Sequence, residues 1–240
     1  MYLQHSARLW AQFPGLAAGA VFATGVHNQA DVTAQAGEFA DIARDRLAAS
    51  AIAELPEIQA WRRTFAAMGL KPTQYRCASE ALLRRFSKEG ALPRIHPVID
   101  LCNALSLAFA IPIGVFDAAR IAGGVTVRHA NGDEPYLTFG GDTEHPQPDE
   151  VIFVDDVGRA HARRWTNRQS GWSAVRDDTT AVLVVAEAVH GTAAADIARL
   201  TAAITEGLSN CWPTATVTAA TPHQHAPRAT FAIESPLGAT

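Results

Sequence analysis

An excess of positive charge is the first feature that this sequence of 240 residues lacks. Lysine and arginine together number 20, and aspartate and glutamate number 24, which gives a formal net charge of −4. Proteins that bind long polyanions often have a strongly basic balance, because they neutralise many phosphates. We therefore expect no DNA partner, and any contact with RNA is expected to use a local patch.

Long apolar runs and a cysteine framework are also missing. No apolar stretch approaches the ~20 residues that a membrane helix needs, and the opening residues MYLQHSARLW lack the basic and apolar runs of a secretory signal. Cys77, Cys102 and Cys211 show no disulfide framework and no metal-ligand spacing, which fits a reducing compartment. We expect a cytoplasmic protein without a membrane partner, in which Cys77 and Cys102 are small core residues.

Nucleotide-binding motifs are absent as well. The chain contains neither a phosphate-binding loop of the GxxxxGK[ST] type nor a dinucleotide fingerprint. His190, His223 and His225 have no cysteine or carboxylate at ligand spacing. We therefore expect no cofactor, no metal and no ATP-dependent ligase, which suits a domain that cleaves or binds.

The hydrophobic fraction is 48%, enough to bury a full core in one large domain. Helical apolar spacing, first-turn proline and glycine stops predict helices over residues 34–50, 56–68, 73–88, 97–110 and 193–208. Short apolar runs between glycine and proline breaks predict strands over residues 18–26, 125–129, 135–139, 151–154, 158–164, 181–189, 215–220 and 229–233. This order favours a mixed α/β fold, with residues 1–240 as a single domain.

The strongest strand prediction contains a charged residue. Residues 181–189, AVLVVAEAV, are apolar except for Glu187, and we expect this strand to be buried on both faces. A carboxylate is costly to bury without a partner. Glu187 therefore either points into a polar pocket or pairs with an arginine, and the sequence leaves both alternatives open.

Three longer stretches carry a family resemblance. They are SEALLRRF (79–86) with LPRIHPVIDLCNALSL (92–107), IPIGVFDAARIAGGVTVRHANGDEPYLTFGG (111–141), and EVIFVDDVGRAHARRW (150–165) with RDDTTAVLVVAEAV (176–189). In this order and at this spacing they resemble the B3/B4 region of the phenylalanyl-tRNA synthetase β subunit, and single-domain proteins built from B3/B4 alone. The resemblance is strongest over residues 60–190, and its specificity comes from the order of the pieces.

The resemblance implies a three-layer fold with a mixed central β-sheet and helices on both sides. In the synthetase, this region hydrolyses tyrosine that is wrongly attached to the phenylalanine tRNA. By analogy, we expect a protein that acts in trans on a mischarged tRNA carrying an aromatic or similar amino acid. A binding module for tRNA or an amino acid, without the chemistry, is the alternative, because fold alone does not fix function.

The resemblance also indicates which residues form the substrate pocket. The family's Pro-x-His-Ala-Phe-Asp loop has a histidine beside the editing substrate, and Gly114 stands in its place. The family's glutamate that recognises the tyrosine hydroxyl matches Val185, and Glu187 lies two residues further on the same side of the strand. We therefore assign catalysis to Glu187 with His96 and Asn103, which would hold a water near the ester carbonyl.

The predicted helix over residues 97–110 carries its polar residues close to one face. Asp100 and Asn103 match the family's Asp-x-x-Asn pattern, and His96 stands where the family usually has asparagine. Polar groups in an apolar segment need partners. They either contact substrate or tie loops together, and the second role is favoured for Asp100.

Two charged clusters, at residues 79–85 and 159–168, are the candidate contacts for the tRNA. A guanidinium beside an aromatic ring suits phosphate contact and base stacking. Alternation along a strand sends Arg163 and Arg164 to opposite faces, so that only one of them lines a given site; a solvated strand edge is the alternative for each arginine. The expected substrate-binding residues are Ser79, Glu80, Arg84, Arg85, Gly114, Arg164 and Trp165.

Overall fold

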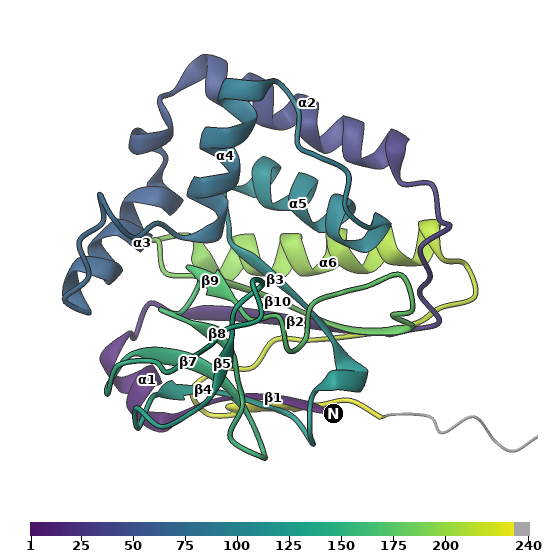
Figure 1. Ribbon diagram of the computed structural model, residues 1–240. Coiled ribbons are helices and arrows are strands. Elements are labelled where there is room, and N and C mark those ends of the chain that lie inside the picture. The colour runs from purple at the N-terminus through teal and green to yellow at the C-terminus, as the bar shows by residue number, and fades with distance from the viewer. Residues whose placement is uncertain (233–240) are drawn as a thin grey trace, which may run out of the picture.

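Two β-sheets and a group of helices make up the structure, which is a computed structural model and describes residues 1–232 (Figure 1). The first sheet has four antiparallel strands in the order β11 (Thr216–Ala220), β2 (Ala17–Thr24), β10 (Ala181–Ala188) and β3 (Ile113–Asp117). β2 comes from the N-terminal part of the chain and β11 from the C-terminal part. Both parts are therefore needed to complete this sheet.

The second sheet has eight strands and is mixed, because β1 runs parallel to β4 and β5 runs parallel to β8. Its order is β12-β1-β4-β7-β8-β5-β6, and β9 pairs with β8 off this path. The bounds are β1 Tyr2–His5, β4 Val125–His129, β5 Tyr136–Leu137, β6 Thr143–Glu144, β7 Val151–Asp155, β8 Ala160–Arg163, β9 Arg168–Gln169 and β12 Arg228–Thr230.

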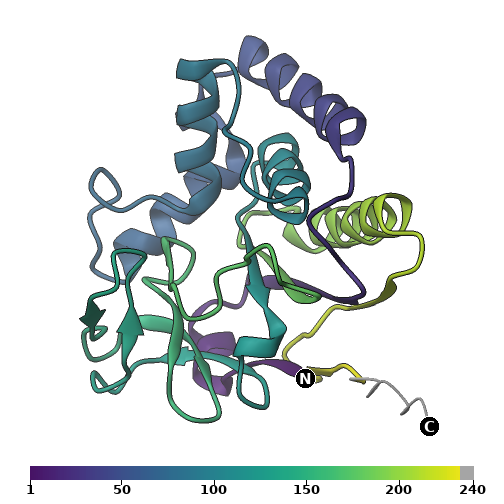
Figure 2. The ribbon, with the colours of Figure 1, turned by 45° about the vertical axis from the view of Figure 1, so that its right-hand side comes forward.

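The helices are α1 (Ala7–Gln12), α2 (Thr33–Ala49), α3 (Pro56–Ala67), α4 (Ala78–Glu89), α5 (Pro97–Phe109) and α6 (Ala193–Cys211), with short 3₁₀ turns at Ile52–Glu54 and Ala118–Arg120. Figure 2 shows α2, α5 and α6 on the same side of the molecule. No helix within residues 1–232 is long and apolar enough to cross a membrane.

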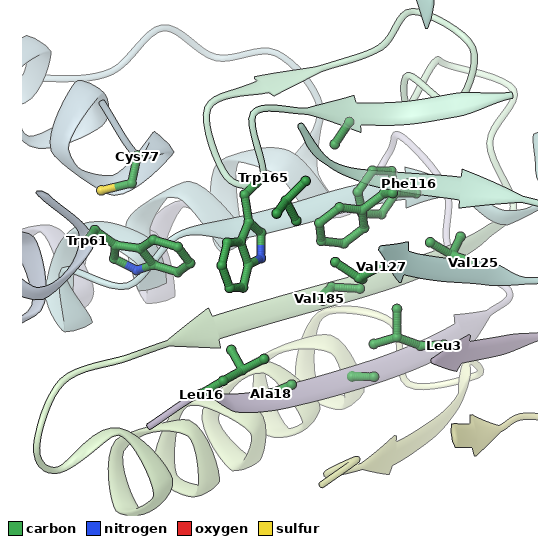
Figure 3. Close-up of a cluster of buried hydrophobic side chains, with 14 of the residues drawn as sticks. Leu3, Leu16, Ala18, Trp61, Cys77, Phe116, Val125, Val127, Trp165 and Val185 are labelled. Carbon is green, nitrogen blue, oxygen red and sulfur yellow. The ribbon is translucent and has the colours of Figure 1, made fainter. Parts of the chain in front are cut away.

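Two apolar clusters hold the layers together. One joins α5 and α6 to one face of the four-stranded sheet, through residues such as Leu105, Leu200 and Val184. The other fills the space between the two sheets, where Val185 and Phe116 meet Val127 (Figure 3), and it extends to α3 and α4 through residues such as Phe65 and Leu83. The layers are therefore helices, a four-stranded sheet and a mixed sheet.

Alternation along β10 decides where its charged residue goes. Val182, Val184 and Ala186 belong to the cluster on the helix side, whereas Leu183 and Val185 belong to the cluster between the sheets. Side chains two residues apart share a face of a strand. Glu187 therefore lies on the face towards the second sheet, opposite to α5.

The predicted mixed α/β fold and the mixed sheet flanked by helices are confirmed, and the structure adds a second sheet. This second sheet is formed by β1, β4 to β9 and β12, and helices α5 and α6 cover only one face of the four-stranded sheet. The end of the strand predicted over residues 229–233 lies outside the described residues. The helix predicted to start at residue 73 starts at Ala78, because the N–H groups of Gln74 and Tyr75 close a turn on the carbonyl of Lys71.

Candidate functional site

A small cavity of about 70 Å³ lies beside β3, the edge strand of the four-stranded sheet. β3 contributes Gly114, and β10 contributes Val185 and Glu187. Gly114 and Val185 face each other directly in the β3–β10 pair. The remaining wall comes from Ala78, Pro112, Ile113, Phe116, Phe153, Ala162 and residues 165–169.

Glu187 is 2% exposed and has two hydrogen-bond partners. Its Oε1 lies 2.6 Å from Nε2 of His5, and its Oε2 accepts a hydrogen bond of 3.0 Å from Nε1 of Trp165. These partners satisfy a carboxylate that is otherwise costly to bury. The alternative of an arginine partner is therefore wrong, and Glu187 is both paired and part of a cavity wall.

Sequence reasoning missed His5. It lies on β1, 182 residues before Glu187, and it is fully buried. The strand Tyr2–His5 has only four residues, which gives too little periodicity to predict it. The pairing of β1 with β4 in the second sheet is what brings the imidazole against the end of β10.

Phe116 occupies the space that a side chain at Gly114 would need. A Cβ atom added to Gly114 would lie 2.9 Å from the ring of Phe116, which is closer than real Cβ contacts. Phe116 is buried and stacks on Phe153, with ring centres 5.6 Å apart. Glycine is therefore the residue that fits beside Phe116, and the histidine that the resemblance implies at this place would meet an aromatic ring.

Trp165 forms a wall of the cavity and is 1% exposed. Its ring packs edge-on against Trp61, with centres 5.1 Å apart, and against Phe13 at 5.0 Å; Figure 3 shows the two tryptophans side by side. A ring buried in this way offers no face to an RNA base. The expectation that Trp165 stacks on a base is therefore not supported by its position.

Arg163 and Arg164 have different environments, as expected, but strand alternation is not the reason. Arg163 is buried and pairs with Glu150 at 2.9 Å and with Glu144 at 2.6 Å. The backbone then turns through left-handed conformations at Arg164 (φ 48°) and Trp165 (φ 55°). Arg164 emerges half-buried, with its guanidinium 4.7 Å from the centre of the Tyr75 ring.

His96 and Asn103 lie in a different and larger hollow. This cleft of about 450 Å³ is bounded by α2, α5 and the loop over residues 90–96. His96 caps α5, since its Nδ1 accepts a hydrogen bond from the N–H of Val98, and burial lowers the pKa of its ring. Asp100 lines the same cleft and accepts from the N–H of Ile95. This contact matches the loop-tying role expected of Asp100.

The catalytic group of Glu187, His96 and Asn103 is therefore not assembled in one hollow. Glu187 lines the small cavity, whereas His96 and Asn103 line the cleft. The cause is the layer arrangement, because α5 covers the face of the four-stranded sheet that is opposite to Glu187. The match to the family's helix pattern could not reveal this separation.

The cluster on α4 divides into buried and exposed residues. Ser79 is fully buried, with its hydroxyl 3.4 Å from Sγ of Cys77. Glu80 is also buried and binds arginines, among them Arg84, whose Nε lies 2.9 Å from Oε1. Arg85 is exposed and pairs with Glu89. Direct substrate contact through Ser79 and Glu80 does not fit their burial, whereas Arg84 is accessible.

Comparison with known proteins assigns the family. The sequence model of the B3/4 domain matches residues 60–210. This chain belongs to the B3/4 domain family. The match includes β3 and β10, and hence Gly114, Val185 and Glu187, but it leaves out β1 with His5.

The similar curated proteins are much longer than this chain. The β subunit of phenylalanine–tRNA ligase from Mycobacterium leprae is 34% identical over 105 residues, which cover 44% of this chain and 12% of that protein. The Chromobacterium violaceum subunit is 34% identical over 77 residues, covering 32% and 10%, and the Nocardia farcinica subunit is 37% identical over 78 residues, covering 32% and 9%. The matched region thus spans about a tenth of the length of these relatives.

One solved structure is similar to part of the B3/4 chain. It is an N-terminal fragment of the phenylalanyl-tRNA synthetase β subunit from Pyrococcus horikoshii, with a TM-score of 0.42 and 12% sequence identity. The similar region covers 52% of this chain and 44% of the fragment.

Proposed function

We propose that this B3/4 protein binds the aminoacyl end of a charged tRNA and hydrolyses the ester of a mischarged one. The observation that carries the proposal is that Gly114, Val185 and Glu187 meet in one cavity on neighbouring strands. The family resemblance puts the editing substrate at Gly114 and Val185, and Glu187 lies two residues further on the same face of β10. The relatives are subunits of a tRNA ligase, which makes a charged tRNA the natural substrate to test.

In this proposal Glu187 positions the substrate. A carboxylate has about four acceptor positions, and His5 and Trp165 use two of them. The remaining capacity suits the ammonium group of the amino acid or a water molecule. An aminoacyl ester is already activated, so that a water held near its carbonyl is sufficient for hydrolysis without a strong base.

The size of the cavity favours a short amino-acid side chain. A dry cavity of about 150 Å³ is known to admit a benzene ring, and the cavity at Gly114 has about 70 Å³. Trp165 and Phe116 fill the space around it. We therefore propose alanine or serine as the amino acid that is removed, in preference to tyrosine.

The test is the release of amino acid from tRNAs charged with alanine, serine or tyrosine. We expect release above the spontaneous rate for the short side chains. Glu187→Gln removes the charged partner of the ammonium group, worth about 1.5–3 kcal/mol, so kcat/KM is expected to fall roughly 10- to 100-fold. The matched control is Glu134→Gln, which changes a buried carboxylate in a turn at Arg128, away from the cavity.

The outcomes separate three cases. Equal losses in both variants would mean that Glu187 acts only through stability, which thermal unfolding of both variants checks independently. Release of tyrosine alone would contradict the proposed preference for short side chains. No release of amino acid from any of the charged tRNAs would contradict the proposed hydrolase activity.

A binding module without chemistry is the second candidate, and one observation favours it. The family's histidine is replaced by Gly114, and the ring of Phe116 leaves no room for a side chain there. This candidate predicts that the protein binds charged tRNA more tightly than uncharged tRNA while the ester remains intact. Equilibrium binding of both forms measures this difference directly.

A further inference from the structure

Three arginines from three segments converge on a single buried carboxylate. Glu80 on α4 accepts two hydrogen bonds from Arg62 of α3, at 2.6 and 3.1 Å. It also accepts one at 2.9 Å from Arg84, one turn further along α4. Arg76, in the loop before α4, places its Nε 3.6 Å from the same carboxylate. We call Arg62, Arg76 and Arg84 the arginine cluster.

The three guanidinium groups of the arginine cluster carry more positive charge than the single carboxylate of Glu80 can neutralise. Burial alone would raise the pKa of Glu80, but the hydrogen bonds from Arg62 and Arg84 outweigh it, and the pKa lies below its usual value. Glu80 therefore stays ionised at neutral pH and offsets one of three guanidinium charges. Two positive charges remain on a chain whose formal net charge is −4.

The same three side chains line a hollow. It has a volume of about 130 Å³ and is completed by Pro72 and Thr73. The side chain of Glu80 is 1% exposed, whereas those of Arg76 and Arg84 are 40% and 45% exposed. The carboxylate thus holds Arg62 and Arg84 by hydrogen bonds, Nη2 of Arg76 donates to the carbonyl of Thr73 at 3.1 Å, and the side chains of Arg76 and Arg84 stay accessible to solvent. Fixed guanidinium groups lose less side-chain entropy when they bind an anion.

Direct hydrogen bonds connect the arginine cluster to the rim of the cavity. The carbonyl of Arg76 accepts a hydrogen bond of 2.7 Å from Nδ2 of Asn167, and the N–H of Ala78 donates to the carbonyl of Thr166 at 2.8 Å. Asn167, Thr166 and Ala78 all line the cavity. The segment that carries Arg76 therefore borders the cavity.

We propose that Arg62, Arg76 and Arg84 bind the phosphates of the RNA strand whose aminoacyl end enters the cavity. The proposal rests on the proposed function and names the contact that holds the substrate beyond its ester. Guanidinium groups match phosphate oxygens in charge and in bidentate geometry. The local charge excess explains how an acidic chain attracts a polyanion at one place.

The experiment compares two variants of the full chain. Arg76→Gln/Arg84→Gln removes the two accessible charges and leaves the two hydrogen bonds of Arg62 to hold Glu80. The matched control is Arg63→Gln, which removes a charge from an exposed position on α3 next to Arg62 and outside the hollow. Thermal unfolding checks that both variants are folded.

The first readout is tRNA affinity as a function of salt. Each phosphate contact contributes about 0.7 to 0.9 to the slope of log K against log salt concentration. We expect the double variant to lose roughly one to two units of this slope and about tenfold or more in affinity at low salt, with Arg63→Gln unchanged. Equal losses in the two variants, or no tRNA binding by the unmodified protein, would overturn the proposal.

The second readout separates this site from the cavity. An aminoacyl ester of adenosine without phosphate reaches the cavity but not the arginine cluster, so its hydrolysis is expected to be the same in the double variant. Reduced hydrolysis of this small ester in a folded double variant would contradict the assignment. If no ester is cleaved but the double variant still shows the smaller salt slope, the proposed phosphate site is supported and the proposed hydrolase activity is contradicted.

Inorganic phosphate at matched ionic strength is the third readout. Binding of phosphate without binding of RNA would overturn the assignment of RNA as the ligand.

Discussion

At the scale of single residues, Gly114 stands where the family resemblance implies a histidine. We expect Gly114→Ala to destabilise the protein by about 1–3 kcal/mol, the usual cost of overpacking, because the new Cβ would lie 2.9 Å from the ring of Phe116. Urea unfolding measures the change. A matched control is Gly37→Ala on α2, where nothing lies within 4 Å and where alanine is expected to stabilise by up to about 1 kcal/mol.

A double-mutant cycle tests whether Phe116 is the cause. Phe116→Leu removes the ring atoms that the new methyl group would meet, so that Gly114→Ala/Phe116→Leu should lose less stability than the two single changes together. Strict additivity of the two losses would show that the crowding lies elsewhere. Full stability of Gly114→Ala alone would contradict crowding by Phe116 as the reason that the family's histidine is missing.

The residues of the cavity were predictable in part. Gly114 and Glu187 were predicted in one site, because the resemblance aligns Gly114 and Val185 with the family's pocket residues and strand alternation puts Glu187 on the same face as Val185. His5 was not predictable, since its contact with Glu187 depends on the pairing of β1 with β4 across the chain. The assignment of His96 and Asn103 to the same site was wrong, because α5 lies on the other side of the four-stranded sheet.

At the scale of elements, Asp155 holds the turn between β7 and β8. Its carboxylate accepts hydrogen bonds from the N–H groups of Val157, Arg159 and Ala122, and Nε2 of His161 lies 3.1 Å away. Burial raises its pKa, but these contacts lower it more, to about 2 from the ordinary value of 3.8. The ionised carboxylate therefore stabilises the folded hairpin.

The sign of the pH dependence follows from this shift. The folded-state pKa lies below the unfolded one, so the stabilisation is complete above about pH 4 and is lost as the pH falls from there towards 2. A shift of this size corresponds to about 2 kcal/mol. We expect Asp155→Asn to lower the free energy of unfolding by about this amount at pH 7 and by much less near pH 2, measured by urea unfolding at each pH.

The control for this prediction is an exposed carboxylate in an ion pair. Asp41→Asn on α2 breaks the pair with Arg44, and exposed pairs contribute about 0–1 kcal/mol. A loss in Asp155→Asn that is equal at both pH values would show that the hydrogen-bond geometry, and not the charge, stabilises the turn.

The elements themselves were predicted well where their pattern is long, and poorly where it is short. The predicted helix over residues 97–110 and the predicted strand over residues 181–189 agree with α5 and β10 to within one residue. The two-residue strands β6 and β9 carry no periodicity. Their existence depends on pairing with distant strands, which no local pattern records.

At the scale of the whole molecule, the family match and the folded unit have different limits. The match begins at residue 60, yet β2 pairs with β10 along eight residues and His5 binds Glu187. Strand pairing of this kind is set by the complete sheet, so that no local pattern could show that the N-terminal residues complete the core. The structure places Leu3, Leu9 and Phe22 in the cluster between the sheets.

The last prediction follows from this difference. A fragment of residues 60–210 leaves one side of β10 without a partner strand and leaves Glu187 without His5. A buried strand edge and an unpaired buried carboxylate each destabilise by several kcal/mol, which is of the order of the whole stability of a domain. We therefore expect the fragment to show no cooperative thermal unfolding and no near-UV circular dichroism.

A circular permutant is the control that distinguishes the loss of β1 and β2 from the effect of breaking the chain at a new place. The N-terminal amine of Met1 donates to the carbonyl of Phe231, and β1 pairs with β12, so the two ends of the described chain lie close together. A permutant that joins the ends through a glycine-rich linker and opens between Gly140 and Gly141, an exposed turn, keeps every strand. We expect the permutant to unfold cooperatively and to keep the contact between His5 and Glu187, whereas the fragment does neither. Cooperative unfolding of the fragment at the melting temperature of the full chain would mean that β1 and β2 are additions to a domain that is complete without them.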